Sequence, residues 1–322
     1  MNISKNTLQV PFTRVLVTLE LSSGRPVSHF PETTLKGGIG YTLKELVCLT
    51  GAKTCDNCML NASCAYAFLF ETPPPPDAPR MKKYRTVPHP FTMKAIQKES
   101  ILTFELTLFG GAYAYLSYFI YALNKLGEKG LGKEKVRFIV KNVLWGERVI
   151  YQAKNCEIDQ NITADTMIVE PGEPQNGTVE LKFSSPLALR KEGRVISSFD
   201  TNTFFTTLLR RCTNLNAFFG VEKQKEIDPD AYLHAVSSLE TQSSMGYHRR
   251  SRYSTRQKKK LDYSGIVGKV VLSGDIGTLM PLLYAGEVFG VGKNTTYGGG
   301  VYRVKEVCGT EKGNTVETGL LQ

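Results

Sequence analysis

The sequence lacks the long apolar runs that would carry it into or across a membrane. The longest apolar stretch, Ala112–Leu123, is too short and too rich in tyrosine to span a bilayer. The N-terminus, MNISKNTLQVPF, has no apolar signal core, so we expect a cytoplasmic protein with no membrane partner. Hydrophobic residues make up 41% and charged residues 22% of the 322 positions. That composition excludes a disordered or fibrous chain and predicts one large or two medium globular domains.

Acidic residues are scarce, with 30 Asp and Glu against 40 Lys and Arg, which gives a net charge of +10. This imbalance favours an acidic partner, most often nucleic acid. No Asp or Glu occurs between Thr241 and Leu261, and Tyr247 and Tyr253 are interleaved with the cations there. A basic run with aromatics suits phosphate contacts and base stacking, and the alternative is a solvated loop. The cations of this run are Arg249, Arg250, Arg252, Arg256, Lys258, Lys259 and Lys260.

The seven cysteines do not form the pattern of a disulfide framework. Their number is odd, and four of them cluster, at Cys48, Cys55, Cys58 and Cys64. The Cys55-x2-Cys58 spacing is that of a zinc knuckle, and four thiolates can close a tetrahedral structural zinc site with no open catalytic position. An iron–sulfur cluster is the less favoured metal alternative, and four reduced thiols are the non-metal alternative.

The hydrophobic pattern predicts two successive halves in which strands and helices alternate. A Pro- and Gly-rich acidic segment, Glu170–Gly177, separates them. We therefore expect an α+β fold of tandem ferredoxin-like (RRM-like) domains, 1–173 and 178–322. The first would carry a cysteine-containing insertion at about 48–91, and the second a C-terminal glycine-rich hairpin. Expected strands are Gln9–Leu21, Ile101–Phe109, one or two within Val136–Gln152, Val179–Phe183, Ile266–Leu272 and Val301–Val307; expected helices are Gly40–Leu49, Ala112–Leu126, Phe199–Phe219 and Leu279–Ala285.

Glycine is concentrated near the C-terminus, with six glycines in the seventeen residues of Gly286–Tyr302. Such density permits positive φ angles and a close approach of backbone to a ligand. Gly290 and Gly292 lie beside Lys293 and Thr295, a combination that suits a phosphate backbone. The segment is not a P-loop, because glycine is absent at 287 and Asn294 replaces the magnesium-binding hydroxyl. The alternative is a glycine-rich hairpin without a ligand.

The glycine-rich stretch Val288–Tyr302 resembles the signature loop of the RAMP superfamily of CRISPR-associated proteins. The rest of the second half is similar to the C-terminal domain of the CRISPR precursor-RNA processing endoribonucleases, the Cas-six family. In the first half the cysteine cluster resembles the cysteine-bearing branch of that family. The matching segments are Leu181–Gly193, Leu208–Arg211, Arg252–Gln257, Gly265–Gly268, Leu279–Leu283, Gly38–Cys48, Cys64–Tyr66, Phe70–Pro73 and Leu108–Gly110.

The resemblance implies a metal-independent endoribonuclease, with no cofactor for catalysis, that cuts precursor crRNA within its repeats. The 2′-hydroxyl would attack the adjacent phosphate and leave a 2′,3′-cyclic phosphate. Implied partners are CRISPR repeat RNA, the mature crRNA and other CRISPR effector subunits. One alternative is a catalytically inert RNA-binding subunit of a CRISPR ribonucleoprotein. Another is a zinc-dependent nucleic-acid-binding protein unrelated to CRISPR.

The sequence departs from the family where many members carry a catalytic histidine, because the first predicted helix has none. That helix offers Tyr41 and Lys44, while His29 precedes it and His248 adjoins the basic run. These four residues are the catalytic candidates, since the reaction needs a general acid, a general base and a cation. The expected RNA-binding residues are the seven cations of the basic run with Arg210, Arg211, Gly290, Gly292, Lys293 and Thr295.

Overall fold

The computed structural model describes residues 6–28, 31–52, 54–75, 77–155, 157–254 and 259–307. The chain divides into two compact units, one of residues 10–166 and one of residues 167–307 together with residues 6–9. We call them the N-terminal unit and the C-terminal unit. The division lies between Thr166 and Met167, a few residues before the segment predicted to separate the domains.

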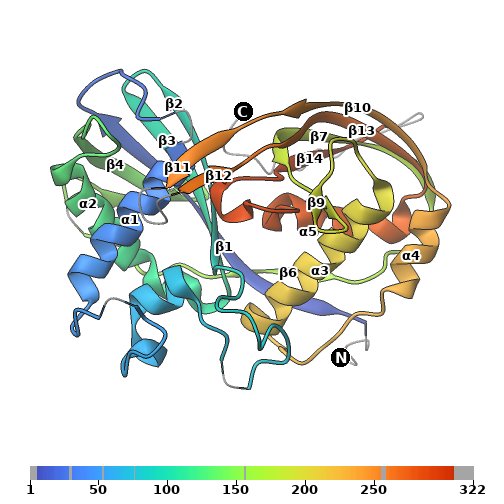
Figure 1. Ribbon diagram of the computed structural model, residues 1–322, viewed down its shortest axis with the longest axis horizontal. Helices are drawn as coiled ribbons and strands as arrows, with labels where there is room; N and C mark the ends of the chain where they lie inside the picture. The colour runs from blue at the N-terminus through green and yellow to red at the C-terminus, as the bar shows by residue number, and fades with distance from the viewer. Residues whose placement is uncertain are drawn as a thin grey trace. The chain divides into compact units, whose positions relative to one another are not determined.

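The N-terminal unit has the βαββαβ order of a ferredoxin-like fold (Figure 1). Its antiparallel sheet has the strand order β2-β3-β1-β4-β5, and a further strand, β6, pairs with β1. The elements are β1 (Leu8–Leu21), α1 (Pro31–Val47), β2 (Phe91–Lys98), β3 (Ile101–Phe109), α2 (Leu116–Lys129), β4 (Phe138–Trp145), β5 (Arg148–Gln152) and β6 (Asp165–Val169).

One face of this sheet is closed by α1 and α2. Alternation along β1 buries Val15, Val17 and Leu19 completely, as the period of a strand requires. On α1, Leu35 and Ile39 lie four residues apart and are both fully buried, so the helix presents one apolar stripe to the core. Truncating either side chain to alanine therefore costs about 2–5 kcal/mol of stability.

Helix α1 begins at Pro31, well before the start predicted at Gly40. Proline suits the first turn of a helix, whereas Gly37, Gly38 and Gly40 lower the helix propensity of this segment. Tertiary packing explains the difference, because a Cβ atom on Gly38 would lie 2.7 Å from the Leu126 side chain of α2. The two helices approach closely here, and this contact outweighs the poor helix propensity of glycine.

The C-terminal unit repeats the same architecture. Its main sheet has the order β10-β13-β7-β14, and β7, α3, β10, β13, α5 and β14 again follow one another as βαββαβ. The predicted α+β tandem of ferredoxin-like units is confirmed. The elements are β7 (Asn176–Leu187), β8 (Arg190–Lys191), β9 (Arg194–Val195), α3 (Thr201–Phe219), α4 (Asp230–Ser237), β10 (Glu240–His248), β11 (Ser251–Ser254), β12 (Lys259–Asp262), β13 (Gly265–Asp275), α5 (Met280–Phe289) and β14 (Tyr302–Glu306).

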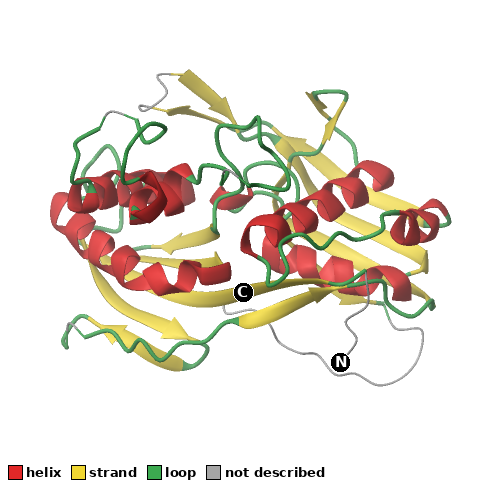
Figure 2. Cartoon of the chain, turned by 90° about the horizontal axis from the view of Figure 1, so that it is seen from below, coloured by secondary structure: helices red, strands yellow, loops and turns green. Residues whose placement is uncertain are grey.

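Helices cover one face of the C-terminal sheet (Figure 2). Aromatic rings form the centre of the core between the sheet and these helices. The Phe183 ring of β7 lies 5.9 Å from the Phe204 ring of α3 and 5.1 Å from the Tyr302 ring of β14, centroid to centroid. The buried Tyr302 hydroxyl donates a hydrogen bond of 2.7 Å to the Leu283 carbonyl of α5. This bond satisfies the one polar atom that the ring brings into the core.

The predicted C-terminal glycine-rich hairpin is wrong in form. The first four residues of the glycine-rich segment belong to helix α5. The remainder contains a short 3-10 turn at Thr295–Tyr297 and then enters β14. Gly286 belongs to α5, where a Cβ atom would lie 2.0 Å from the Tyr302 hydroxyl. Gly286 therefore allows α5 to pack closely against β14 and does not lie in a turn.

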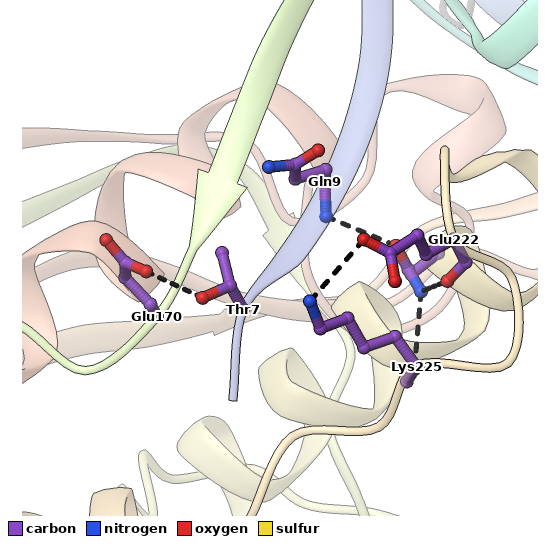
Figure 3. A network of polar contacts seen from close by, with 6 residues as sticks. Thr7, Gln9, Glu170, Glu222 and Lys225 are labelled. Carbon is purple, nitrogen blue, oxygen red and sulfur yellow. Dashed lines mark hydrogen bonds and ion pairs between the residues drawn. The ribbon is translucent and has the colours of Figure 1, made fainter. Parts of the chain in front are cut away.

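The first described residues are held in the C-terminal unit by a polar network (Figure 3). The Thr7 hydroxyl donates to Glu170 Oε2 at 2.7 Å, and the Gln9 backbone N–H donates to Asn216 Oδ1 at 3.2 Å. Asn216, fully buried on α3, donates through Nδ2 to the Glu222 carbonyl at 2.8 Å and to the Lys225 carbonyl at 3.3 Å. A single side chain thus joins the start of β1 to the loop after α3.

None of the helices in the described part of the chain is long and apolar enough to cross a bilayer.

Candidate nucleic-acid interface

The basic run forms an antiparallel hairpin. Arg249 and Arg250 are exposed between β10 and β11, and β11 pairs with β12. In this register Arg252 lies opposite Leu261, and the next two pairs place Lys260 and Lys259 on β12. Arg256 and Lys258 lie outside the described residues. Part of the run is therefore a two-stranded ribbon, which carries Arg252, Lys259 and Lys260.

The base of this hairpin is fixed by hydrogen bonds and by one aromatic contact. The Arg250 N–H donates to the Ser264 hydroxyl at 2.9 Å, and the Tyr263 N–H donates to the Arg250 carbonyl at 2.9 Å. The buried Tyr263 ring packs edge-on against Tyr297 of the glycine-rich segment, with centroids 5.6 Å apart. The two segments singled out from the sequence therefore meet in the structure.

The glycine-rich segment is hydrogen-bonded to the chain at the end of β7. The Lys293 N–H donates to the Ala188 carbonyl at 3.1 Å, and the Gly300 N–H donates to the Pro186 carbonyl at 3.0 Å. Gly292 and Gly300 have φ angles of +84° and +65°, as the glycine density predicts. A Cβ atom on Gly300 would lie 1.7 Å from the Val291 carbonyl oxygen. The close approach that these glycines permit is therefore to the chain's own backbone.

Lys293 itself is exposed and lies near a second cation. Burial lowers the pKa of its ammonium, Arg190 lowers it further, and Asp262 acts in the opposite direction. Lys293 and Arg190 repel each other, and a phosphate bound near both would offset this repulsion. Arg190 begins the small β8–β9 hairpin, which also carries Lys191 and Arg194. We call the exposed set the cationic end: Arg190, Lys191, Arg194, Arg249, Arg250 and Lys293.

Sequence reasoning missed the three cations of the β8–β9 hairpin. Their charge density is lower than that of the basic run, because Glu192 and Gly193 separate Lys191 from Arg194. Lys191 also forms an ion pair of 3.1 Å with Asp200, the residue that caps α3. A short basic pair, a Gly turn and a further cation are a weak signal in the sequence, and only the fold brings Arg190 near Lys293.

Two residues predicted to contact RNA point into the protein. The Arg211 guanidinium donates to the Phe289 carbonyl through Nη2 at 3.2 Å and through Nε at 3.3 Å, and burial lowers its pKa to about 10. It holds the end of α5, just before Gly290. The Thr295 side chain is buried against Gly290. A direct phosphate contact by Arg211 or Thr295 does not fit these positions, whereas Arg210 is exposed on α3.

The catalytic candidates occupy different surroundings. His248 is exposed at the end of β10 in the C-terminal unit, opposite Gly265 and next to Arg249. His29 lies outside the described residues. In the N-terminal unit, Tyr41 is 73% exposed on α1. The Lys44 ammonium donates to the Ala52 carbonyl at 3.1 Å and lies 5.5 Å from the centre of the Tyr66 ring.

The four clustered cysteines are free thiols, each half-buried, and all four line one pocket of about 430 Å³ in the N-terminal unit. The pKa of Cys55 is raised, first by burial and then by Glu71. For Cys48, slight burial raises the pKa, but hydrogen bonds with Gly51 and Thr50 outweigh it, and the net shift is downward. Among the described residues, no three His, Cys, Asp or Glu side chains stand close enough together to hold a metal ion.

A family model described as CRISPR-associated endoribonuclease Cas6 matches residues 181–302. The C-terminal unit is therefore similar to the Cas6 family over these residues. A second family model, described as an N-terminal domain, matches residues 9–166. The chain is also 23% identical, over 308 residues, to an uncharacterized protein of Archaeoglobus fulgidus, covering 91% of this chain and 99% of the relative.

Solved Cas6 structures have a similar fold over most of the chain. Thermus thermophilus Cas6 has a TM-score of 0.53 at 14% identity, over 92% of this chain and 99% of that one. A Cas6 product complex has a TM-score of 0.51 at 16% identity over the same shares. A partial Cas6-RT-Cas1–Cas2 complex has a TM-score of 0.53 at 12% identity, over 94% of this chain and 47% of that one. At these identities the likeness shows the two-unit Cas6 fold.

Proposed function

We propose that this protein binds CRISPR repeat RNA and cuts precursor crRNA within its repeats. One observation supports the proposal above the others: the residues that match the Cas6 endoribonuclease family, 181–302, are those that build the cationic end. One of the similar structures is a Cas6 product complex, and a product implies that this Cas6 acted on a substrate. That activity is of the same kind as the one proposed here.

The cationic end supplies the affinity for the RNA backbone. Its cations come from two hairpins and the glycine-rich segment, and these elements are cross-connected through Ala188, Tyr263 and Tyr297. A preorganised set of cations releases counterions when it meets phosphates, so binding is strong at low salt and weakens steeply as salt rises. The fixed geometry of the segments lowers the entropic cost of ordering them on binding.

The proposed cleavage step needs no metal, because the nucleophile belongs to the RNA. A general base takes the proton of the 2′-hydroxyl, whose oxygen attacks the adjacent phosphorus. The bond from phosphorus to the 5′-oxygen breaks, and a general acid protonates that leaving oxygen. The products are a 2′,3′-cyclic phosphate and a 5′-hydroxyl.

Among the catalytic candidates in the described residues, His248 has the most suitable surroundings for one of the two proton transfers. It is exposed, histidine in general titrates near neutral pH, and the adjacent Arg249 can stabilise charge on the phosphorane. His29 is the other histidine candidate. Tyr41 remains accessible on α1, whereas the Lys44 ammonium is engaged by the Ala52 carbonyl, which argues against a free proton-transfer role.

The runner-up is an RNA-holding subunit that does not cut. Helix α1 contains no histidine, and that observation favours it. Both functions fit a protein that stays with its crRNA inside a larger CRISPR assembly. One similar structure is a partial Cas6-RT-Cas1–Cas2 complex.

Catalysis is tested with labelled repeat RNA, an excess of protein and EDTA. We expect His248→Ala or His29→Ala to slow cleavage by about a hundredfold or more, since acid–base groups contribute that much. His234→Ala, an exposed histidine on α4, is the matched control and should cut at the wild-type rate. Wild-type rates in all three variants would rule out His248 and His29 as the catalytic histidines.

Binding is tested through its salt dependence. Arg190→Ala and Lys293→Ala should each weaken RNA binding and reduce the slope of log K against log salt by about 0.7 for each phosphate that the side chain neutralises. Lys223→Ala removes an exposed charge elsewhere in the same unit and should leave the slope unchanged. A slope that falls equally in all three variants would mean that only the net charge matters and would contradict a site at the cationic end.

A further inference from the structure

Four thiols converge on one pocket, which we call the cysteine pocket. Cys48 follows the end of α1, Cys55 and Cys58 bracket a tight turn, and Cys64 ends a 3-10 turn at Asn61–Ser63. All four line the same pocket of about 430 Å³. The Thr50 hydroxyl lies 3.5 Å from the Cys58 sulfur and 4.0 Å from the Cys48 sulfur, so these two thiols face each other across one hydroxyl.

The segment that carries these cysteines has no hydrophobic core of its own. None of the described residues from 48 to 64 is buried, and Leu49 and Met59 are 86% and 89% exposed. Its backbone hydrogen bonds are local, such as Cys58 N–H to the Cys55 carbonyl at 3.3 Å. The ion pair between Arg85 and Asp56 at 3.0 Å is exposed, and such pairs contribute little stability. Only partly buried side chains, such as Cys55 and Cys64, pack against the core of the unit. A segment with so little buried apolar surface gains stability from a cross-link or a metal.

We propose that Cys48, Cys55, Cys58 and Cys64 bind one zinc ion in a structural site. Zinc takes four thiolates in a tetrahedron with Zn–S distances of about 2.3 Å, so the cluster supplies a complete ligand set. The Cys55-x2-Cys58 turn brings two ligands from one loop, and Cys48 and Cys64 bring one each from the flanking helical segments. Each thiol releases its proton to water as its sulfur binds the metal.

Closing this site requires the sulfurs to move inward, because no three of the metal-binding side chains in the described ranges are yet within reach of one ion. The absence of buried side chains among the described residues between Cys48 and Cys64 permits that movement at little energetic cost. Four thiolates around Zn²⁺ carry a net charge of −2. Thr50 can donate a hydrogen bond to them, and the Lys44 ammonium beside Ala52 offsets part of the charge.

The zinc site would fasten the end of α1 to the core of the N-terminal unit. Cys64 is followed by the helical segment Ala67–Glu71, in which Leu69 and Phe70 belong to the hydrophobic core. A metal held by both flanks therefore ties the cysteine segment to that core. Zinc should raise the thermal midpoint of the protein whether or not the protein cuts RNA, so the inference stands independently of the proposed function.

The test is a metal titration of the full chain, stripped of metal and reduced. One equivalent of Zn²⁺ should be bound per chain, protect four thiols from a thiol reagent and raise the thermal midpoint. Co²⁺ in its place should give the visible absorption of a tetrahedral tetrathiolate site. The result that overturns the proposal is reduced protein that binds no zinc and shows the same thiol reactivity with and without it. A purified protein that carries iron and sulfide at these cysteines also overturns it.

Two variants complete the experiment. Cys58→Ser should lose the bound zinc and its thermal effect. Cys212→Ala is the matched control, because Cys212 is buried on α3 in the other unit, and it should still bind one zinc. Zinc binding that survives in Cys58→Ser with unchanged stoichiometry and affinity would contradict the assignment. The wild-type titration keeps the proposal testable even where a variant fails to fold.

Discussion

Removal of the Asn216 side chain should destabilise the C-terminal unit. Its side chain is fully buried and makes three hydrogen bonds, to the Gln9 N–H and to the carbonyls of Glu222 and Lys225 (Figure 3). Asn216→Ala leaves all three backbone groups without this partner. Each hydrogen bond contributes about 0.5–1.5 kcal/mol, and an unsatisfied buried group costs about 1–3 kcal/mol.

The carbonyls of Glu222 and Lys225 lie in a loop that water can reach, so hydrogen bonds to water replace part of the lost stabilisation. The Gln9 N–H loses its partner. We therefore expect Asn216→Ala to lower the free energy of unfolding by about 2–4 kcal/mol. Urea unfolding followed by far-UV circular dichroism measures the change. Asn202→Ala, at an exposed position on the same helix, is the control and should change stability by less than about 0.5 kcal/mol. If the two variants have equal stability, the buried network does not hold the N-terminal strand, and the reasoning fails.

Three further predictions concern single residues. Asp200 caps α3 through the Thr203 N–H and has a lowered pKa, so its contribution is present above about pH 4 and is lost as pH falls through that lowered value. Asp200→Ala should lower the free energy of unfolding by about 1 kcal/mol and Asp200→Asn by much less, as measured by thermal or urea unfolding. Equal losses of stability in the two variants would contradict the capping role. Arg211→Met should lower the thermal midpoint while Arg210→Met should not, because Arg211 holds the end of α5; the reverse order would be inconsistent with its buried position. Gly300→Ala should lower both the thermal midpoint and RNA affinity, since a Cβ there meets a backbone carbonyl at 1.7 Å, and normal binding would refute this.

The strands that alternation predicted are present, because alternation is a local signal, but β2, β6 and β8 to β12 were not predicted. The strand expected at Ile101–Phe109 is β3, with the same bounds, and the first strand differs from its prediction by one residue. The start of α1 was missed because glycine propensity and helix–helix packing act in opposite directions there. The hairpin expected at Gly286–Tyr302 was wrong because glycine allows both turns and close packing, and sequence alone does not separate the two.

The interface was only partly predictable, for a related reason. The adjacent residues Arg210 and Arg211 look equivalent in sequence, yet successive positions on a helix point about 100° apart, so one reaches solvent and the other reaches Phe289. Arg190 was missed because its place beside Lys293 depends on a long-range return of the chain to the end of β7. Charge density marks a binding segment, but which cations share one site follows from the fold.

The most direct test of the account is a single-turnover incubation of the wild-type protein with the CRISPR repeat RNA of its own host, in EDTA, followed by analysis of both RNA ends. The account predicts one cut within the repeat, a 2′,3′-cyclic phosphate on the upstream fragment and a 5′-hydroxyl on the downstream fragment. Repeat RNA that is bound tightly but keeps its full length would contradict the endoribonuclease and leave the RNA-holding subunit in its place.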